Sequence, residues 1–517
     1  MNEIRKLMLE LVKIDSVTAS PDGEKRAAEF IYEWLSKLDY FVKYPEKLCR
    51  INVKDKNYFA VSALVHAAKP TNRAVILTGH YDVVDAEDCG TIKGWAYDPE
   101  EYTKRIADIK ISDEARNDLE SGRYLFGRGV ADMKLGLSVE MIILKQFSED
   151  TSLYDVNIMF LAVPDEEGDS FGMRTAVEPL WRMQEQGHEF VVYLNTEPSF
   201  VGGEHKNSPA IYNGTIGKMM PFYMCVGKET HVGKYSEGLN SLLIASYLNI
   251  TAEGRDKRTS CLYMRDQRRS YAVTLPERTA VYFNHLYPLS SNTTPASLIE
   301  TMKADAEAAL LRTFEHFGED FRNENKWEPH VISVEELLEL ASKREGTDKA
   351  LLMNKLADEL PDMSDEREKN IEIVNRLLDI SAEKGPLVIV GFLPPFYPAR
   401  ENSGGTPACQ HIERAIEKLT DYARREFSLP VYRAGIMGGI TDLSFTGFNG
   451  NAAELEPLAK NMPLWGRGYE IPLATLTRID IPVLNFGPLG KDCHKMTERA
   501  DMEYSLNVLP QLLRFLI

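Results

Sequence analysis

"AVILTGHYDVVD", residues 74–85, is the most informative segment for predicting the fold. It begins as an unbroken apolar run, Ala74 to Leu77, and continues through Thr78 and Gly79 to His80 and Asp82. A strand without polar alternation is typical of one buried on both faces, as at the centre of an α/β sheet. In open α/β sheets, binding sites form outside the carboxyl ends of the strands. The stretch therefore predicts an α/β fold with His80 at the site-forming edge of its sheet.

Four other segments place polar residues in the same way. The apolar run 156–163 leads into "PDEEGDSFG" with Glu166 and Glu167, the run 190–194 precedes Glu197, and the run 481–486 precedes His494. "LFGRGVADMKLGLSVEMIILKQF" puts Asp132 at the start of a helix whose expected buried face is Leu135, Val139, Ile142 and Ile143. Taken singly, such residues fit a solvated loop, a structural histidine or a helix cap. Together they favour one shared site.

Composition and charge limit the classes of partner. The chain has 517 residues, 44% of them hydrophobic, and a formal charge of −18. This acidic balance disfavours binding to nucleic acid or to an anionic membrane, and it suits bound metal. The N-terminal segment predicts an amphipathic helix instead of a signal peptide, and the six cysteines lack disulfide or zinc-finger spacing. We therefore expect a cytoplasmic protein with reduced thiols.

The candidate ligands favour zinc chemistry. Two histidines and three carboxylates suit zinc better than calcium, which prefers oxygen-only shells, or iron–sulfur centres, which need thiolates. Three carboxylates and one hydroxide would neutralise two divalent ions, with one carboxylate bridging metals about 3.5–4 Å apart. Asp82 lies on the same side of an extended chain as His80, so we expect it to accept the second imidazole N–H. Adjacent side chains diverge, so Glu166 and Glu167 should have separate roles.

These motifs resemble those of the zinc-dependent peptidases and deacylases that include aminoacylases, succinyl-diaminopimelate desuccinylases and glutamate carboxypeptidases. The similar segments are "GHYDVV", "GRGVADMKLG", "PDEEGDSFG", "NTEP" and "DCHK", in the family's order. The resemblance implies an α/β fold: a catalytic domain with a mixed, mostly parallel sheet flanked by helices, and an inserted α+β lid and dimerisation domain. It also implies two divalent metal ions per chain, with zinc favoured and cobalt or manganese as alternatives.

The same resemblance implies a role for each residue. Asp132 would bridge the two metals, His80 and Glu197 would complete one zinc site, and Glu167 and His494 the other. Glu166 would be the general base, taking a proton from the metal-bridging water and passing it to the leaving amine.

The resemblance also extends to residues around the metals. Gly438, Gly439, Thr441 and Asp442 resemble the family's glycine-rich substrate loop. His231, on the lid, would stabilise the oxyanion, often in the partner subunit's site, which implies a homodimer formed through the lid domain. The arginine that would bind a substrate carboxylate stays open among Arg255, Arg258, Arg268, Arg269 and Arg278.

Strand and helix patterns change near Asn213 and again near residue 401. We predict a discontinuous catalytic domain, residues 1–212 and 401–517, and a lid, residues 213–400. A charged insertion between Asp85 and Gly127 and a helix-rich stretch at 319–383 depart from compact members of the family. Together with "VIVGFLPPFYPARENS", they make the chain similar to the RocB-like arginine-utilisation branch.

The expected function is hydrolysis of an amide bond in a small N-acyl amino acid or short peptide, with arginine derivatives among the candidates. Two alternatives remain. A dipeptidase or aminopeptidase would differ in reading a free α-amino group. A catalytically silent, metal-dependent binding or regulatory protein would have no need of Glu166 as a base beside the metal.

Overall fold

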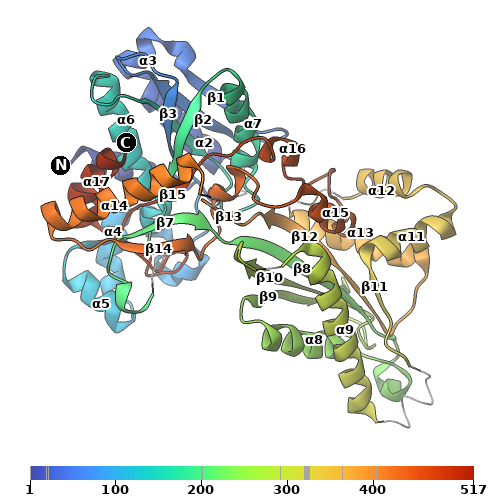
Figure 1. The fold of residues 1–517 in the computed structure, drawn as a ribbon. Coiled ribbons are helices and arrows are strands. Elements are labelled where there is room, and N and C mark those ends of the chain that lie inside the picture. The colour runs from blue at the N-terminus through green and yellow to red at the C-terminus, as the bar shows by residue number, and fades with distance from the viewer. Residues whose placement is uncertain are drawn as a thin grey trace. The chain divides into compact units, whose positions relative to one another are not determined.

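A computed structural model describes residues 2–18, 20, 22–199, 202–291, 293–318, 327–361, 363, 365–402 and 405–517 (Figure 1). The chain divides into two compact units. Unit 1 comprises residues 1–216, 399–449 and 472–517, and unit 2 comprises residues 217–398 and 450–471. Within the described residues, no helix is both long and apolar enough to cross a bilayer.

Unit 1 is built on a nine-stranded mixed sheet. Its path is β1 (Leu48–Asn52), β2 (Phe59–Val65), β5 (Asn157–Val163), β3 (Arg73–His80), β6 (Glu189–Asn195), β15 (Val483–Asn485), β7 (Ala210–Thr215) and β13 (Arg400–Glu401), and β14 (Tyr432–Met437) also pairs with β7. The four central strands β5, β3, β6 and β15 are parallel, whereas β1, β2, β7 and β13 are joined by antiparallel pairing.

The register of the parallel strands brings their carboxyl ends together. His80 pairs with Val163, Thr78 pairs with Asn195, and Asn485 also pairs with Asn195. The loops that follow β3, β5, β6 and β15 therefore leave the same edge of the sheet side by side. This is the edge that the sequence predicted as the location of the site.

Helices cover this sheet. They include α1 (Glu3–Val12), α2 (Gly23–Ser36), α3 (Asp39–Lys43), α6 (Leu135–Glu149), α7 (Phe171–Glu185), α14 (Pro407–Phe427), α16 (Leu473–Leu476) and α17 (Leu509–Leu516). The predicted amphipathic face of α1 is buried, as are the four predicted core residues of α6. Helix α6 contacts α1 as well as strands β3 and β5. It is buried on almost every side because it packs between α1 and the strands of the sheet.

The charged insertion after Asp85 folds into short elements. These are η2 (Glu87–Trp95), α4 (Pro99–Arg105), η3 (Ile106–Asp108), α5 (Asp113–Glu120) and β4 (Tyr124–Phe126). They enclose a small apolar core that includes Ile92, Tyr102, Ile106 and Phe126. Strand β4 then joins a second sheet of unit 1 in the order β16 (Gly490–Lys491), β17 (Arg499–Asp501), β4.

Unit 2 contains a five-stranded sheet. Its order is β11 (Val331–Ser333), β12 (Leu387–Tyr397), β8 (Gly217–Val226), β10 (Arg278–Tyr287) and β9 (Thr259–Asp266), with only the β11–β12 pair parallel. Helices α8 (Ser241–Arg255) and α9 (Pro295–Phe317) pack on each other (Figure 1). Thr294 caps α9 by accepting the Ser297 N–H, and Pro295 occupies the first position of the helix.

The helix-rich stretch 319–383 enlarges unit 2. Residues 319–326, 362 and 364 of this stretch lie outside the described residues. The remainder forms α11 (Val334–Glu345), α12 (Lys349–Asp358) and α13 (Glu366–Ser381), which share a core with strands β8 and β12.

Residues 450–471 correct the predicted domain division. We expected this segment, which includes α15 (Glu456–Lys460), in the catalytic domain, but it belongs to unit 2. Leu464 is buried in the core of unit 2, and its backbone N–H donates to Asn370 Oδ1 at 2.9 Å. Tyr469 donates its hydroxyl to the Phe396 carbonyl and accepts the Phe396 N–H. These contacts join residues far apart in sequence, so no local sequence pattern could predict them.

Candidate active site

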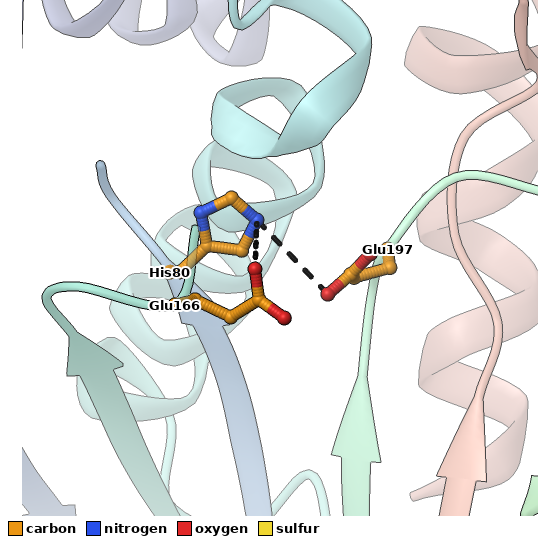
Figure 2. Close-up of side chains that lie close together, drawn as sticks. All are labelled: His80, Glu166 and Glu197. Atoms are coloured by element: carbon orange, nitrogen blue, oxygen red, sulfur yellow. Dashed lines mark ion pairs between the residues drawn. The ribbon is translucent and has the colours of Figure 1, made fainter. Parts of the chain in front are cut away.

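The predicted metal ligands meet at the carboxyl edge of the parallel strands in unit 1. Figure 2 shows His80, Glu166 and Glu197 pointing toward one another from the ends of β3, β5 and β6. His80 Nε2 lies 4.0 Å from Glu166 Oε2 and 4.0 Å from Glu197 Oε1. All three side chains are buried. Because the two distances are equal, distance alone does not separate a ligand from a proton acceptor.

Asp132 lies between the two histidines. Its Oδ1 is 3.2 Å from His80 Nε2, and its Oδ2 is 3.3 Å from His494 Nε2. His494 Nε2 is also 2.8 Å from Glu167 Oε1. One carboxylate therefore presents each oxygen to a different imidazole, which is the arrangement that a bridging ligand requires.

The hydrogen bonds of His80 fix its tautomer. His80 Nδ1 lies 3.0 Å from the Asp82 main-chain carbonyl, which can only accept a hydrogen bond. When the ring is neutral, this bond places its proton on Nδ1 and directs the Nε2 lone pair at the site, where Asp132 Oδ1 lies 3.2 Å away. We expected the Asp82 carboxylate as the acceptor, but Asp82 Oδ1 is farther away, at 3.5 Å.

The Asp82 carboxylate makes other bonds. Its Oδ1 accepts the backbone N–H of Glu166 at 3.1 Å, and its Oδ2 accepts that of Glu167 at 3.0 Å. The hydroxyl of Thr18 also donates to Oδ2, at 2.8 Å. Asp82 thus joins the end of β3 to the loop that carries both glutamates, a role that the sequence analysis did not anticipate.

Burial and repulsion dominate the electrostatics of the site. Burial and the charge of Glu197 raise the pKa of Glu166 well above its ordinary value. Burial, followed by the charge of Asp132, does the same to Glu197. Burial also raises the pKa of Glu167, although its bond to His494 opposes that shift. Several carboxylates packed at short range call for a compensating cation.

The donor set fits divalent metal. His80, Glu166 and Glu197 can bring one ligand atom each within 4.8 Å of one another, and so can His80, Asp132 and Glu167. Two imidazoles with several carboxylates match the nitrogen and oxygen ligands of zinc, and the absence of thiolates among them argues against an iron–sulfur group. Cys493 is next to His494, but burial raises the pKa of its thiol well above its usual range.

Three residues that the sequence analysis missed support the ligand loops. Glu498 Oε1 accepts the backbone N–H groups of Ala131 and Asp132 at 3.2 and 3.4 Å, while its Oε2 pairs with Arg128 at 2.9 Å. Asn485 exchanges two hydrogen bonds with the backbone of Glu197. Arg128, inside the motif "GRGVADMKLG", is a weak sequence signal for the first pair, whereas Asn485 has none.

The predicted substrate loop follows β14 in unit 1. Thr441 caps η7 (Asp442–Phe445) by accepting the Leu443 N–H, and the Gly439 carbonyl accepts the Thr215 hydroxyl at 3.0 Å. Gly438 has open space where a Cβ would lie. Asp442 is buried, which raises its pKa to about 7. The charge of Asp442 in turn contributes to the raised pKa of Glu166.

His231 belongs to unit 2. It is exposed at the start of η6 (Val232–Glu237), and its Nδ1 accepts the Gly233 N–H at 3.1 Å. The candidate arginines of unit 2 all have an acidic partner. The pairs are Arg255 with Asp305, Arg258 with Asp256, Arg268 with Asp266, Arg269 with Glu372 and Arg278 with Asp379.

Comparison with known proteins gives a family match. The family model described as "Peptidase family M20/M25/M40" matches residues 76–452. This range contains His80, Asp132, Glu166, Glu167 and Glu197, and it ends before His494.

Full-length relatives and a solved structure agree with this match. The chain is 32% identical to "Uncharacterized protein YqjN" of Bacillus subtilis (strain 168), covering 100% of this chain and 96% of the relative. It is 27% identical to "Protein RocB" of the same organism, covering 99% and 94%. A tripeptidase structure from Staphylococcus aureus shares the fold with a TM-score of 0.51 at 14% identity, covering 100% of this chain and 97% of that one.

Proposed function

Because the chain belongs to the M20/M25/M40 peptidase family and is thus a metal-dependent hydrolase, we propose that it cleaves an amide bond in a small N-acyl amino acid or short peptide. The observation that carries this proposal is the position of Asp132, whose two oxygens each face a different histidine, with the buried carboxylate of Glu166 near His80. This arrangement supports two adjacent cations with a proton acceptor next to them.

The proposed metal ligands divide into two sets. Asp132 bridges, His80 and Glu197 complete one set, and Glu167 and His494 complete the other. Zinc is the favoured ion, with cobalt or manganese as alternatives, because imidazole and carboxylate together suit these metals. When bound, the two ions would polarise the scissile carbonyl and make water a stronger acid.

Glu166 is the proposed general base. Its carboxylate takes a proton from water at Oε1 or Oε2 and then delivers that proton to the leaving amine nitrogen. Burial supports this role, because it raises the pKa of Glu166 and so makes its carboxylate a better proton acceptor than an exposed glutamate. Asp82 orients Glu166 by accepting its backbone N–H.

The chain's likeness to Protein RocB along nearly its whole length supports the RocB-like branch, which makes arginine derivatives the first substrates to test. Gly438, Gly439, Thr441 and Asp442 would line the substrate pocket. We also propose that the protein acts in the cytoplasm, where its six cysteines would stay reduced thiols.

We propose that the protein forms a homodimer through unit 2, with His231 serving the partner's site. Strand β9 lies at the outer edge of its sheet, and Leu262 on β9, Tyr235 in η6 and Tyr271 in the loop after β9 are exposed apolar or aromatic side chains. Unpaired edge strands with exposed apolar residues favour association.

Light scattering tests the dimer. The protein should have the mass of two chains, and Leu262→Lys should yield monomers, while Leu153→Lys, at an exposed leucine of unit 1, should leave the dimer intact. If the wild-type protein is a monomer, the dimer proposal is wrong.

Metal analysis and amine release on the same sample test the proposed activity. We expect about two zinc ions per chain and release of amine from a panel of N-acyl amino acids and dipeptides that includes arginine derivatives. Cleavage confined to substrates with a free α-amino group would favour a dipeptidase or aminopeptidase. Bound metal without turnover on any member would favour a binding or regulatory protein.

A further inference from the structure

The loop that carries His494 needs support from elsewhere in the protein. His494 lies in the turn between β16 and β17, and half of its side chain is exposed. Its Nε2 contacts only Asp132 and Glu167 among the bonds of the described residues, and both of these are proposed ligands of the same ion. His80, by contrast, is the last residue of a central strand, and its Nδ1 is hydrogen-bonded to the Asp82 main-chain carbonyl.

The insertion after Asp85 contacts this turn at several points. Strand β4, at the end of the insertion, pairs with β17 over three residues, from Arg499↔Phe126 to Asp501↔Tyr124. The buried Tyr102 of α4 donates its hydroxyl to the Met496 carbonyl at 2.8 Å. Met496, two residues after His494, packs against the apolar core of the insertion.

A charged cluster makes the third connection. Asp118 Oδ2 on α5 accepts hydrogen bonds from Lys491 Nζ at 2.9 Å and from Arg499 Nε at 2.8 Å. Arg499, which is almost fully buried, also donates to Asp492 Oδ2 and to the Thr497 carbonyl. Asp118 therefore holds both strands of the hairpin whose turn contains His494. Buried or partly buried charge pairs of this kind stabilise one geometry, since losing one partner leaves the other uncompensated.

We propose that the insertion, residues 86–126, is a brace that positions His494 and thereby sets the affinity of the metal site formed with Glu167. Tyr102 and Asp118 are its positioning residues, and neither contacts a proposed ligand. The inference rests on the proposed metal-dependent function. It gives the insertion a role in metal binding, although the insertion supplies none of the proposed ligands. Mutation of residues that orient metal ligands without binding the metal themselves commonly weakens metal affinity by about 10- to 100-fold.

Zinc titration of the metal-free protein in competition with a chromogenic chelator tests the brace. For Tyr102→Phe and Asp118→Asn, one of two zinc ions should bind roughly ten-fold more weakly, the other should bind as in the wild type, and excess zinc should restore turnover. The matched control is Glu100→Gln, since Glu100 lies on α4 of the same insertion but pairs with Arg5 on α1. It should leave both affinities unchanged.

A double variant identifies the affected site. His494→Ala removes a ligand of the braced site, so adding Asp118→Asn to it should cause no further loss at the remaining zinc. Thermal unfolding of the metal-free variants provides a readout of fold alone, and its midpoint should stay near that of wild type for Tyr102→Phe.

Three results would overturn the brace. The first is unchanged zinc affinity in both variants. The second is equal weakening of both zinc sites with a lower unfolding midpoint in the metal-free protein, which would indicate a purely structural role. The third is a wild-type protein that does not take two zinc ions; this outcome rejects the proposed metal centre as well, whereas the first two leave it standing.

Discussion

Glu166 and Glu197 lie at the same distance from His80, so distance alone does not assign their roles. Each has one oxygen 4.0 Å from His80 Nε2, yet the proposal makes one a proton carrier and the other a ligand. Glu166→Gln should keep about two zinc ions and lower turnover by about 10²- to 10⁴-fold, because only proton transfer is lost. Glu197→Gln should instead lose one zinc ion. Metal analysis and steady-state kinetics of both variants decide the assignment, and loss of zinc from Glu166→Gln would reverse it.

The candidate ligands could be proposed from the sequence because they follow apolar runs. His80, Glu167, Glu197 and His494 each fit a structural role when taken singly, but together they favour one site at the carboxyl edge of the sheet. Glu498 and Asn485 could not be found in this way. Their partners, Ala131 and Glu197, are hundreds of positions away in the chain, and a carboxylate or amide that binds backbone N–H groups looks in sequence like any surface residue.

At the scale of elements, the central strands and long helices were predicted well. Apolar runs define β3, β5 and β6, and Thr294 with Pro295 marks the start of α9. The insertion was not predictable because its elements are too short for periodicity to show, and its fold depends on contacts with the hairpin β16–β17. Short segments of this kind take their structure from packing instead of from local propensity.

The buried Glu140 on helix α6 should make the stability of the protein depend on pH. Glu140 is fully buried beside Thr78 and Thr196, and burial raises its pKa well above the ordinary value. Between the pKa of the unfolded chain, about 4.3, and the higher folded pKa, the folded state holds the extra proton. The free energy of unfolding should therefore fall as pH rises through this window, by up to about 1.4 kcal/mol per pH unit from this group.

Glu140→Gln removes that proton uptake. Relative to wild type, the variant should gain stability as the pH rises above the pKa of the unfolded chain, about 4.3, by up to about 1.4 kcal/mol per pH unit, as measured by urea unfolding at each pH. Glu149→Gln is the matched control, since Glu149 lies at the exposed end of the same helix. A constant difference between Glu140→Gln and wild type across this range would show that Glu140 is ionised in the folded protein.

At the scale of the whole molecule, the two units divide after residues 216 and 398, whereas we predicted domain crossings near residues 213 and 401 and no third segment. Changes of strand and helix pattern mark the first two. Residues 450–471 have no such change, because what places them in unit 2 is the burial of Leu464 and the bonds of Tyr469 to Phe396. The relative of unknown function and Protein RocB match over nearly the full length, so we expect the same division in both.

The division into units predicts which part of the chain becomes less stable when metal is removed. Every proposed ligand lies in unit 1, so a chelator should leave like-charged carboxylates facing one another there and nowhere in unit 2. Hydrogen–deuterium exchange followed by mass spectrometry should show faster exchange after chelation in peptides covering 128–134 and 490–499, where backbone loops hold Asp132 and His494. Peptides covering β8 and β12 should exchange as before, because these central strands of unit 2 keep their own core. Equal acceleration in both units would mean that they open as one cooperative body, and that the metal centre stabilises the whole chain.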